Sequence, residues 1–134
     1  MMKKILVIED DDLVLRLLKK MLGIEGYTIE CASNGKEGVE KFRENPADLV
    51  ITDLIMPEQD GIETIIQLKE TAPDLKIIAI SGGGQLGPGK VDARDYLDIA
   101  KSFGAFCILP KPIDRKELIK TVKQALLPED SPPS

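Results

Sequence analysis

Short apolar runs alternate along the chain with longer segments in which apolar residues recur every three or four positions. The short runs are typical of β-strands and cover residues 5–8, 27–31, 49–52, 77–80 and 106–109. The longer segments are typical of amphipathic helices and include residues 13–22, 39–42, 62–68, 96–100 and 118–126. Strands separated by helices pair in parallel through right-handed crossovers. The pattern therefore predicts an α/β protein with five parallel strands and five helices.

The apolar character of the strands indicates how the sheet is covered. The first, third and fourth runs are almost wholly apolar, as expected for strands with helices on both faces. A chain of 134 residues, 43% of them apolar, is large enough for one core. We predict a single domain over residues 1–127, followed by a disordered tail at 128–134 that is rich in proline and acidic residues.

Charge and residue usage exclude several classes of function. The net charge of −5 and a pI near 4.8 argue against binding to nucleic acid or to an anionic membrane, so a protein or cationic partner is expected. The apolar run after Lys3 and Lys4 is too short for a signal peptide, and no run spans a bilayer, which favours a cytoplasmic location. The absence of histidine excludes Ser-His-Asp and Cys-His catalysis and histidine zinc sites. Cys31 and Cys107 lie in apolar runs, which predicts buried reduced thiols.

Chemically useful side chains follow four of the five predicted strands. Glu9 and Asp10 follow the first strand, Asp53 the third, Ser81 the fourth and Lys111 the fifth. The carboxyl ends of parallel strands meet at one edge of the sheet, so these groups should converge there. Three carboxylates repel one another unless a cation lies between them, and oxygen ligands with spare positions suit Mg²⁺. With one hydroxyl and one ammonium group nearby, the set predicts a metal-assisted phosphoryl acceptor.

Each of these residues also has a plainer interpretation. The acidic run that begins at Glu9 is compatible with helix capping, which we expect for Asp11 and Asp12. Asp53 alone could be a turn residue and Ser81 a loop residue. Capping and turns do not require matched chemistry at four separate strand ends, and this favours the functional interpretation.

The glycine-rich segment at residues 82–90 predicts a long flexible loop. Its residues 84–90 match a nucleotide-binding phosphate loop up to the last position of that motif, where Val91 lacks the hydroxyl group that would bind Mg²⁺. The loop also follows the fourth predicted strand instead of opening the fold. A surface loop is therefore favoured over a nucleotide hydrolase.

The strand-end motifs together resemble the receiver domain of two-component response regulators, in particular the stand-alone type similar to chemotaxis regulators. The resemblance covers residues 3–127 and includes the segment Asp-x-x-Met-Pro-x-x-Asp-Gly at residues 53–61. It implies a flavodoxin-like, doubly wound sheet in strand order 2-1-3-4-5, a Mg²⁺ cofactor, and phosphoryl transfer from a histidine kinase. The family often has a cis peptide bond at the position of Lys111 and Pro112, so the resemblance implies a cis bond here.

The resemblance also implies a role for each site residue. These roles are phosphoacceptor for Asp53, direct metal ligand for Asp10, ligand through water for Glu9, ligand through its backbone carbonyl for Ile55, phosphoryl contact for Ser81 and ion partner for Lys111. Where the family often has a switching aromatic residue, this chain has Ile108, and Phe106 lies two residues earlier on the same face of the strand. Ile55 and Gly83 occupy the positions that tune hydrolysis in the family and offer no polar side chain, so slow self-dephosphorylation is expected.

We therefore expect a receiver that accepts a phosphoryl group on Asp53 from a histidine kinase or histidine phosphotransferase and then changes its affinity for a protein partner. Turnover of a separate substrate is not expected. One alternative is a phosphorelay intermediate that passes the group on to a histidine phosphotransferase. Another, of a different class, is an interaction module that is never phosphorylated.

Overall fold

The computed structural model describes residues 3–54, 61–81, 98 and 100–127. The strands are β1 (Lys4–Ile8), β2 (Thr28–Ala32), β3 (Leu49–Asp53), β4 (Lys76–Ser81) and β5 (Cys107–Pro110). The helices are α1 (Asp12–Ile24), α2 (Gly35–Glu44), α3 (Gly61–Thr71) and α5 (Arg115–Ala125). Residues 98 and 100–102 are also helical and continue the remaining segment of helical pattern. The predicted alternation is confirmed.

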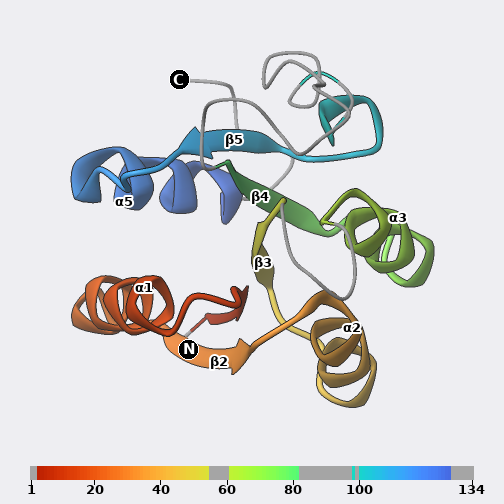
Figure 1. Ribbon diagram of the computed structural model, residues 1–134, viewed down its shortest axis with the longest axis horizontal. Helices are drawn as coiled ribbons and strands as arrows, with labels where there is room; N and C mark the ends of the chain where they lie inside the picture. The colour runs from red at the N-terminus through yellow and green to blue at the C-terminus, as the bar shows by residue number, and fades with distance from the viewer. Residues whose placement is uncertain (1–2, 55–60, 82–97, 99, 128–134) are drawn as a thin grey trace.

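The five strands form one parallel sheet in the order β2-β1-β3-β4-β5. This arrangement confirms the predicted flavodoxin-like topology. In Figure 1 the strands run between two layers of helices, with α1 and α5 on the left and α2 and α3 on the right. No helix among the described residues is long and apolar enough to cross a membrane.

Two hydrophobic clusters hold the helices against the sheet, one on each face. Successive residues of β1 alternate between them: Leu6 and Ile8 belong to the cluster under α2 and α3, whereas Ile5 and Val7 belong to the cluster under α1 and α5. Ala100 is buried in the cluster with α2 and α3, so the helical segment around it lies on that face. Two helices, α1 and α5, therefore pack on one face of the sheet, while α2, α3 and the segment around Ala100 pack on the other.

The two cysteines are free, as predicted, but only half-buried. Cys31 lies in β2 and Cys107 in β5, and these strands form the two edges of the sheet. An edge strand lacks a neighbour on one side, which leaves its side chains less covered than those of a central strand. Partial burial nevertheless raises the pKa of the Cys31 thiol.

Asp11 caps α1, as the alternative interpretation of the acidic run predicts. Its carboxylate accepts hydrogen bonds from the backbone N–H groups of Leu13 at 2.9 Å and Val14 at 3.3 Å. We expect Asp11→Ala to lower the free energy of unfolding by about 1 kcal/mol, because two helix donors lose their acceptor.

Urea denaturation of Asp11→Ala measures this loss, with Asp12→Ala as the matched control. Among the described residues Asp12 pairs with the exposed Arg16 alone, so its replacement should cost a few tenths of a kcal/mol. An equal loss in both variants would show that helix-dipole charge, and not the cap, stabilises this end of α1.

Candidate functional site

The strand ends bring the predicted site residues to one edge of the sheet. Asp53 is the last residue of β3 and Ser81 the last residue of β4, while Glu9 follows β1 directly and Lys111 follows β5 directly. The register pairs Asp53 with Ile80, one residue before Ser81. Because neighbouring parallel strands end at the same level, residues that are distant in sequence meet here.

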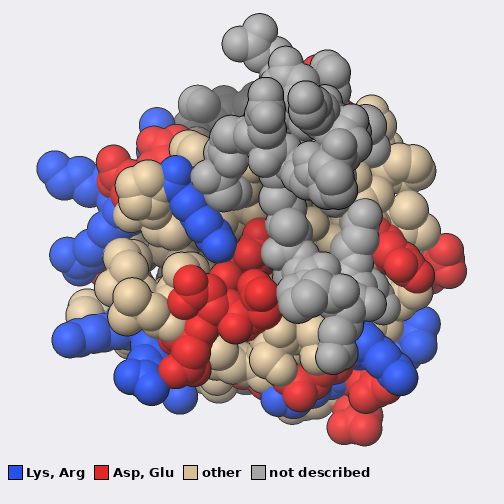
Figure 2. All heavy atoms as spheres, viewed as in Figure 1, with Lys and Arg blue, Asp and Glu red and all other residues tan. Residues whose placement is uncertain are grey.

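Three carboxylates form a cluster at this edge. Glu9, Asp10 and Asp53 each offer an oxygen, and these oxygens lie within 4.8 Å of one another. Glu9 and Asp53 are buried, with 1% and 4% of their surface exposed, whereas Asp10 is exposed. In Figure 2 a group of red side chains fills the centre of this face. The cluster is therefore open to solvent on the side of Asp10 and enclosed on the other.

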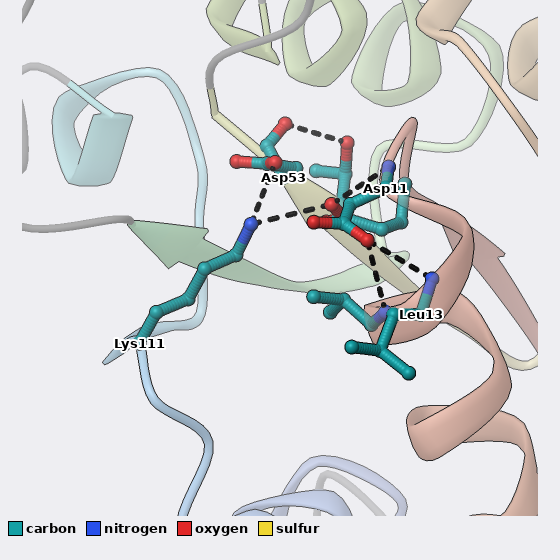
Figure 3. Close-up of polar contacts among 7 residues, drawn as sticks. Asp11, Leu13, Asp53 and Lys111 are labelled. Atoms are coloured by element: carbon teal, nitrogen blue, oxygen red, sulfur yellow. Dashed lines mark hydrogen bonds and ion pairs between the residues drawn. The ribbon is translucent and has the colours of Figure 1, made fainter.

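Lys111 supplies the positive charge that faces this cluster. Its Nζ lies 3.1 Å from Oδ2 of Asp53 and 3.2 Å from Oε1 of Glu9, and Figure 3 shows the side chain extending from the segment after β5 towards Asp53. The backbone N–H of Lys111 donates to the carbonyl oxygen of Ser81 at 2.7 Å. The bond between Lys111 and Pro112 is cis, as the resemblance implies.

The close carboxylates change the protonation of Glu9. The pKa of Glu9 is raised from 4.5 to about 7, chiefly by burial and further by the charge and hydrogen bonding of Asp53, while Lys111 opposes these effects. Burial alone would lower the pKa of Lys111, but hydrogen bonds and charges from Asp53 and Glu9 raise it overall. One ammonium group therefore compensates only part of the repulsion between the carboxylates.

The site is chemically suited to a divalent cation. Oε2 of Glu9 is buried and has no hydrogen-bond partner among the residues described. Burying a carboxylate oxygen that has no hydrogen bond costs free energy, unless the oxygen contacts a cation or a water molecule bound to a cation. The three carboxylates supply only oxygen ligands and leave positions for water, which is the environment that Mg²⁺ prefers. The acidic cluster thus fits a Mg²⁺ site.

The remaining predicted site residues lie partly inside and partly outside the described part of the chain. Ser81 is buried, with 3% exposure, at the end of β4 beside Lys111. Ile55, the predicted carbonyl ligand, lies outside the described residues, as do Gly83, the loop at 82–90 and the tail at 128–134. Ile108 packs against the cluster under α2 and α3, whereas Phe106 is 38% exposed, with Nζ of Lys76 at 5.6 Å from its ring centre.

Gly61 is a feature of the site that sequence reasoning did not single out. Its N–H donates to the carbonyl oxygen of Leu54 at 3.0 Å, so the start of α3 touches the residue after Asp53. A Cβ atom at Gly61 would lie 2.4 Å from Cα of Leu54 and 2.5 Å from the carbonyl oxygen of Asp53. Only glycine fits this approach, and the signal for it was the Asp-Gly that ends the segment at 53–61.

Comparison with known proteins agrees with the fold. Residues 5–123 match the family model of the response regulator receiver domain. The response regulator receiver protein CpdR of Brucella abortus is 37% identical over 128 residues, which cover 94% of this chain and 98% of CpdR. A receiver domain protein from Clostridium thermocellum has a structure with a TM-score of 0.83 and 32% identity, covering 93% of this chain and 94% of that one.

The chain belongs to the response regulator receiver family. Receiver domains are phosphoacceptors rather than conventional enzymes, and they interact with kinases and other proteins. Some relatives are much longer: the sensor kinase CckA of Brucella abortus is 36% identical over 128 residues, which are 94% of this chain but 13% of CckA. The similarity to CckA therefore concerns one region of a larger protein.

Proposed function

We propose that this receiver accepts a phosphoryl group on Asp53 from a histidine kinase or histidine phosphotransferase and then changes its affinity for a protein partner. The observation that carries the proposal is the 3.1 Å contact between Nζ of Lys111 and the carboxylate of Asp53 beside two further carboxylates. This contact holds a nucleophile and a cation at one open edge of the sheet. The free thiols of Cys31 and Cys107 fit a reducing compartment, and we place the activity in the cytoplasm.

In the proposed reaction a carboxylate oxygen of Asp53 attacks phosphorus, and the bond between phosphorus and the donor's histidine nitrogen breaks. Negative charge is spread over the phosphoryl oxygens during the transfer, so groups that bind those oxygens lower the barrier. Lys111 supplies one charge and the hydroxyl group of Ser81 a hydrogen bond. Mg²⁺, when held by Glu9, Asp10, Asp53 and the carbonyl of Ile55, supplies further positive charge to the same oxygens.

Incubation with a small phosphodonor and Mg²⁺, followed by intact-mass measurement, tests the proposal. We expect the mass to increase by one phosphoryl group in the wild type and not in Asp53→Asn. Asp48→Asn is the control, because Asp48 is an exposed carboxylate that hydrogen-bonds the backbone N–H of Lys4. An unmodified wild-type chain would favour an interaction module that is never phosphorylated.

The similarity to a region of a sensor kinase supports a second candidate, a phosphorelay intermediate. In this role Asp53 would pass its phosphoryl group to the histidine of a phosphotransferase. Loss of radiolabel from the pre-phosphorylated chain, with gain of label on a purified histidine phosphotransferase, would distinguish the relay from a terminal receiver. Slow self-dephosphorylation, argued from Ile55 and Gly83, stays a prediction that the same labelled sample can measure.

Lys111 should transmit phosphorylation to the rest of the fold. We expect Lys111→Ala to remain phosphorylated by a small donor but to lose the response that follows, because no ammonium group is left to move from the carboxylates to the phosphoryl oxygens. Amide hydrogen exchange before and after phosphorylation measures this response at the ends of β4 and β5. Lys120→Ala, an exposed change on α5, is the control, and an unchanged response in Lys111→Ala would contradict the assigned role.

A further inference from the structure

A groove separate from the acidic cluster runs along α5. Its volume is about 630 Å³, and side chains from α5, from Leu127 just after it and from Glu25 just after α1 line it. Four of the lining residues are cations, namely Arg115, Lys116, Lys120 and Lys123. Lys116, Lys120 and Lys123 recur at spacings of four and three, which places them along one side of the helix, and Arg115 precedes Lys116 directly.

The charge of this groove is opposite to that of the protein. The chain has 18 basic and 23 acidic residues and a net charge of −5, yet the groove sets four cations against the single carboxylate of Glu25. In Figure 2 several blue side chains lie at the left of the view, where Figure 1 places α5 and α1. A local positive field of this kind attracts an anionic partner.

Glu25 demonstrates that the cations can reach a carboxylate in the groove. Its oxygens lie 3.9 Å from an Nη atom of Arg115 and 3.8 Å from Nζ of Lys123. Both cationic side chains are more than half exposed, at 58% and 63%, so these pairs contribute little to stability and can exchange for others. Within the described part of the chain, Lys116 and Lys120 make no ion pair.

The groove also contains apolar surface between its charges. Leu127 is 49% exposed at one end, and Ile119 lies between the cations and packs partly against the core under α1 and α5. An exposed leucine alone would carry no meaning. Aligned with Ile119 and flanked by cations, it offers an anchoring position for an apolar side chain of a ligand.

We propose that this groove binds an acidic, amphipathic segment of a partner protein. The ten steps of α5 from Arg115 to Ala125 correspond to roughly 15 Å of helix, which matches about three turns of a partner helix. Carboxylates on that segment would pair with Lys116 and Lys120 and replace Glu25 at Arg115 and Lys123. The net charge of −5 disfavours nucleic acid and anionic membranes, whose extended charge would also meet the acidic remainder of the surface. This inference goes beyond the proposed phosphoryl transfer and does not depend on it.

Fluorescence anisotropy with labelled synthetic peptides tests the proposal. The probe is a helical peptide of about three turns with glutamates on one face and leucines on the other, and its comparison peptide has glutamine for every glutamate. We expect the acidic peptide to bind at least about tenfold more tightly than the glutamine peptide. We expect Lys116→Glu combined with Lys120→Glu to weaken its binding by about tenfold or more.

The matched control reverses two charges elsewhere. Lys36→Glu combined with Arg43→Glu changes the net charge equally on α2, at two exposed positions, and should leave binding within about twofold of the wild type. Circular dichroism checks that each variant is folded. If the Lys116→Glu and Lys120→Glu double variant is unfolded, Lys116→Gln combined with Lys120→Gln replaces it in the binding test. Equal weakening in both double variants would overturn the proposal.

Two further measurements distinguish the acidic peptide from other polyanions and the groove from the phosphorylation site. Tighter binding to a short DNA duplex, or to vesicles of anionic phospholipid, than to the acidic peptide would also overturn the proposal. Asp53→Asn should bind the peptide as the wild type does. Failure of the groove proposal is therefore distinguishable from failure of phosphorylation, since the two are read in different variants.

Discussion

Gly61→Ala is expected to lower the free energy of unfolding by about 3 kcal/mol, at the upper end of the usual cost of over-packing. The added Cβ atom would lie 2.4 Å from Cα of Leu54, 2.5 Å from the carbonyl oxygen of Asp53 and 2.7 Å from that of Leu54. All three are backbone atoms, so no side-chain rotation can relieve the contact. The backbone at the end of β3 has to move, and Asp53 is part of it.

Urea denaturation of the metal-free protein measures the loss, and Gly23→Ala is the control. Gly23 lies in α1 with no atom within 4 Å of an added Cβ, so alanine there should stabilise the protein by about 0.5–1 kcal/mol. Phosphorylation of Gly61→Ala by a small donor should also slow, because the nucleophile is displaced. Similar stability changes in the two variants would show that α3 can withdraw from Leu54 at little cost.

The metal-free protein is expected to lose stability as the pH rises from about 4.5 to about 7. Glu9 has a pKa of about 7 in the folded chain and 4.5 as its ordinary value. Between these values the native state binds the proton more tightly than the unfolded state does, so protonated Glu9 favours folding at low pH. This contribution is fully present below pH 4.5 and disappears as the pH passes 7, with a total of about 3 kcal/mol.

Chemical denaturation at several pH values in the presence of a chelator measures the slope. Glu9→Gln should remove most of it, because glutamine is neutral throughout, whereas Glu44→Gln, an exposed change on α2, should leave it in place. Millimolar Mg²⁺ should reduce the slope and stabilise the protein near pH 7, since the ion binds the carboxylate form. A slope that persists in Glu9→Gln would assign the titration to another group.

The sequence pattern predicted the fold well, because the order of strands and helices follows from the periodicity of apolar residues. The apolar run at residues 49–52 predicted β3, and the structure extends this strand by one residue to include Asp53. Both faces of β1 and β3 are buried, and their continuous apolar sequence indicated this directly. Convergence of the strand-end residues follows from parallel pairing alone, so the grouping of Glu9, Asp53 and Lys111 was also within reach.

Contacts and burial of individual side chains could not be predicted from the sequence, and the reason is physical. Half-burial of Cys31 and Cys107 follows from the edge positions of β2 and β5, which their own apolar neighbours do not encode. The contact of Gly61 with Leu54 depends on the path between β3 and α3. The raised pKa of Glu9 depends on the depth at which its carboxylate is buried. Each property arises from distances between segments, and sequence periodicity carries no information about such distances.

Parallel pairing throughout the sheet also has a consequence for how the chain folds. Lys4 pairs with Thr28 and Ile5 with Leu49, so each ladder must close a long loop before its first hydrogen bonds form. The central contact of β1 with β3 encloses α1, β2 and α2, which makes it the costliest of these closures. Helices, whose contacts are local, should therefore form ahead of the sheet, and docking of β3 beside β1 should limit the folding rate.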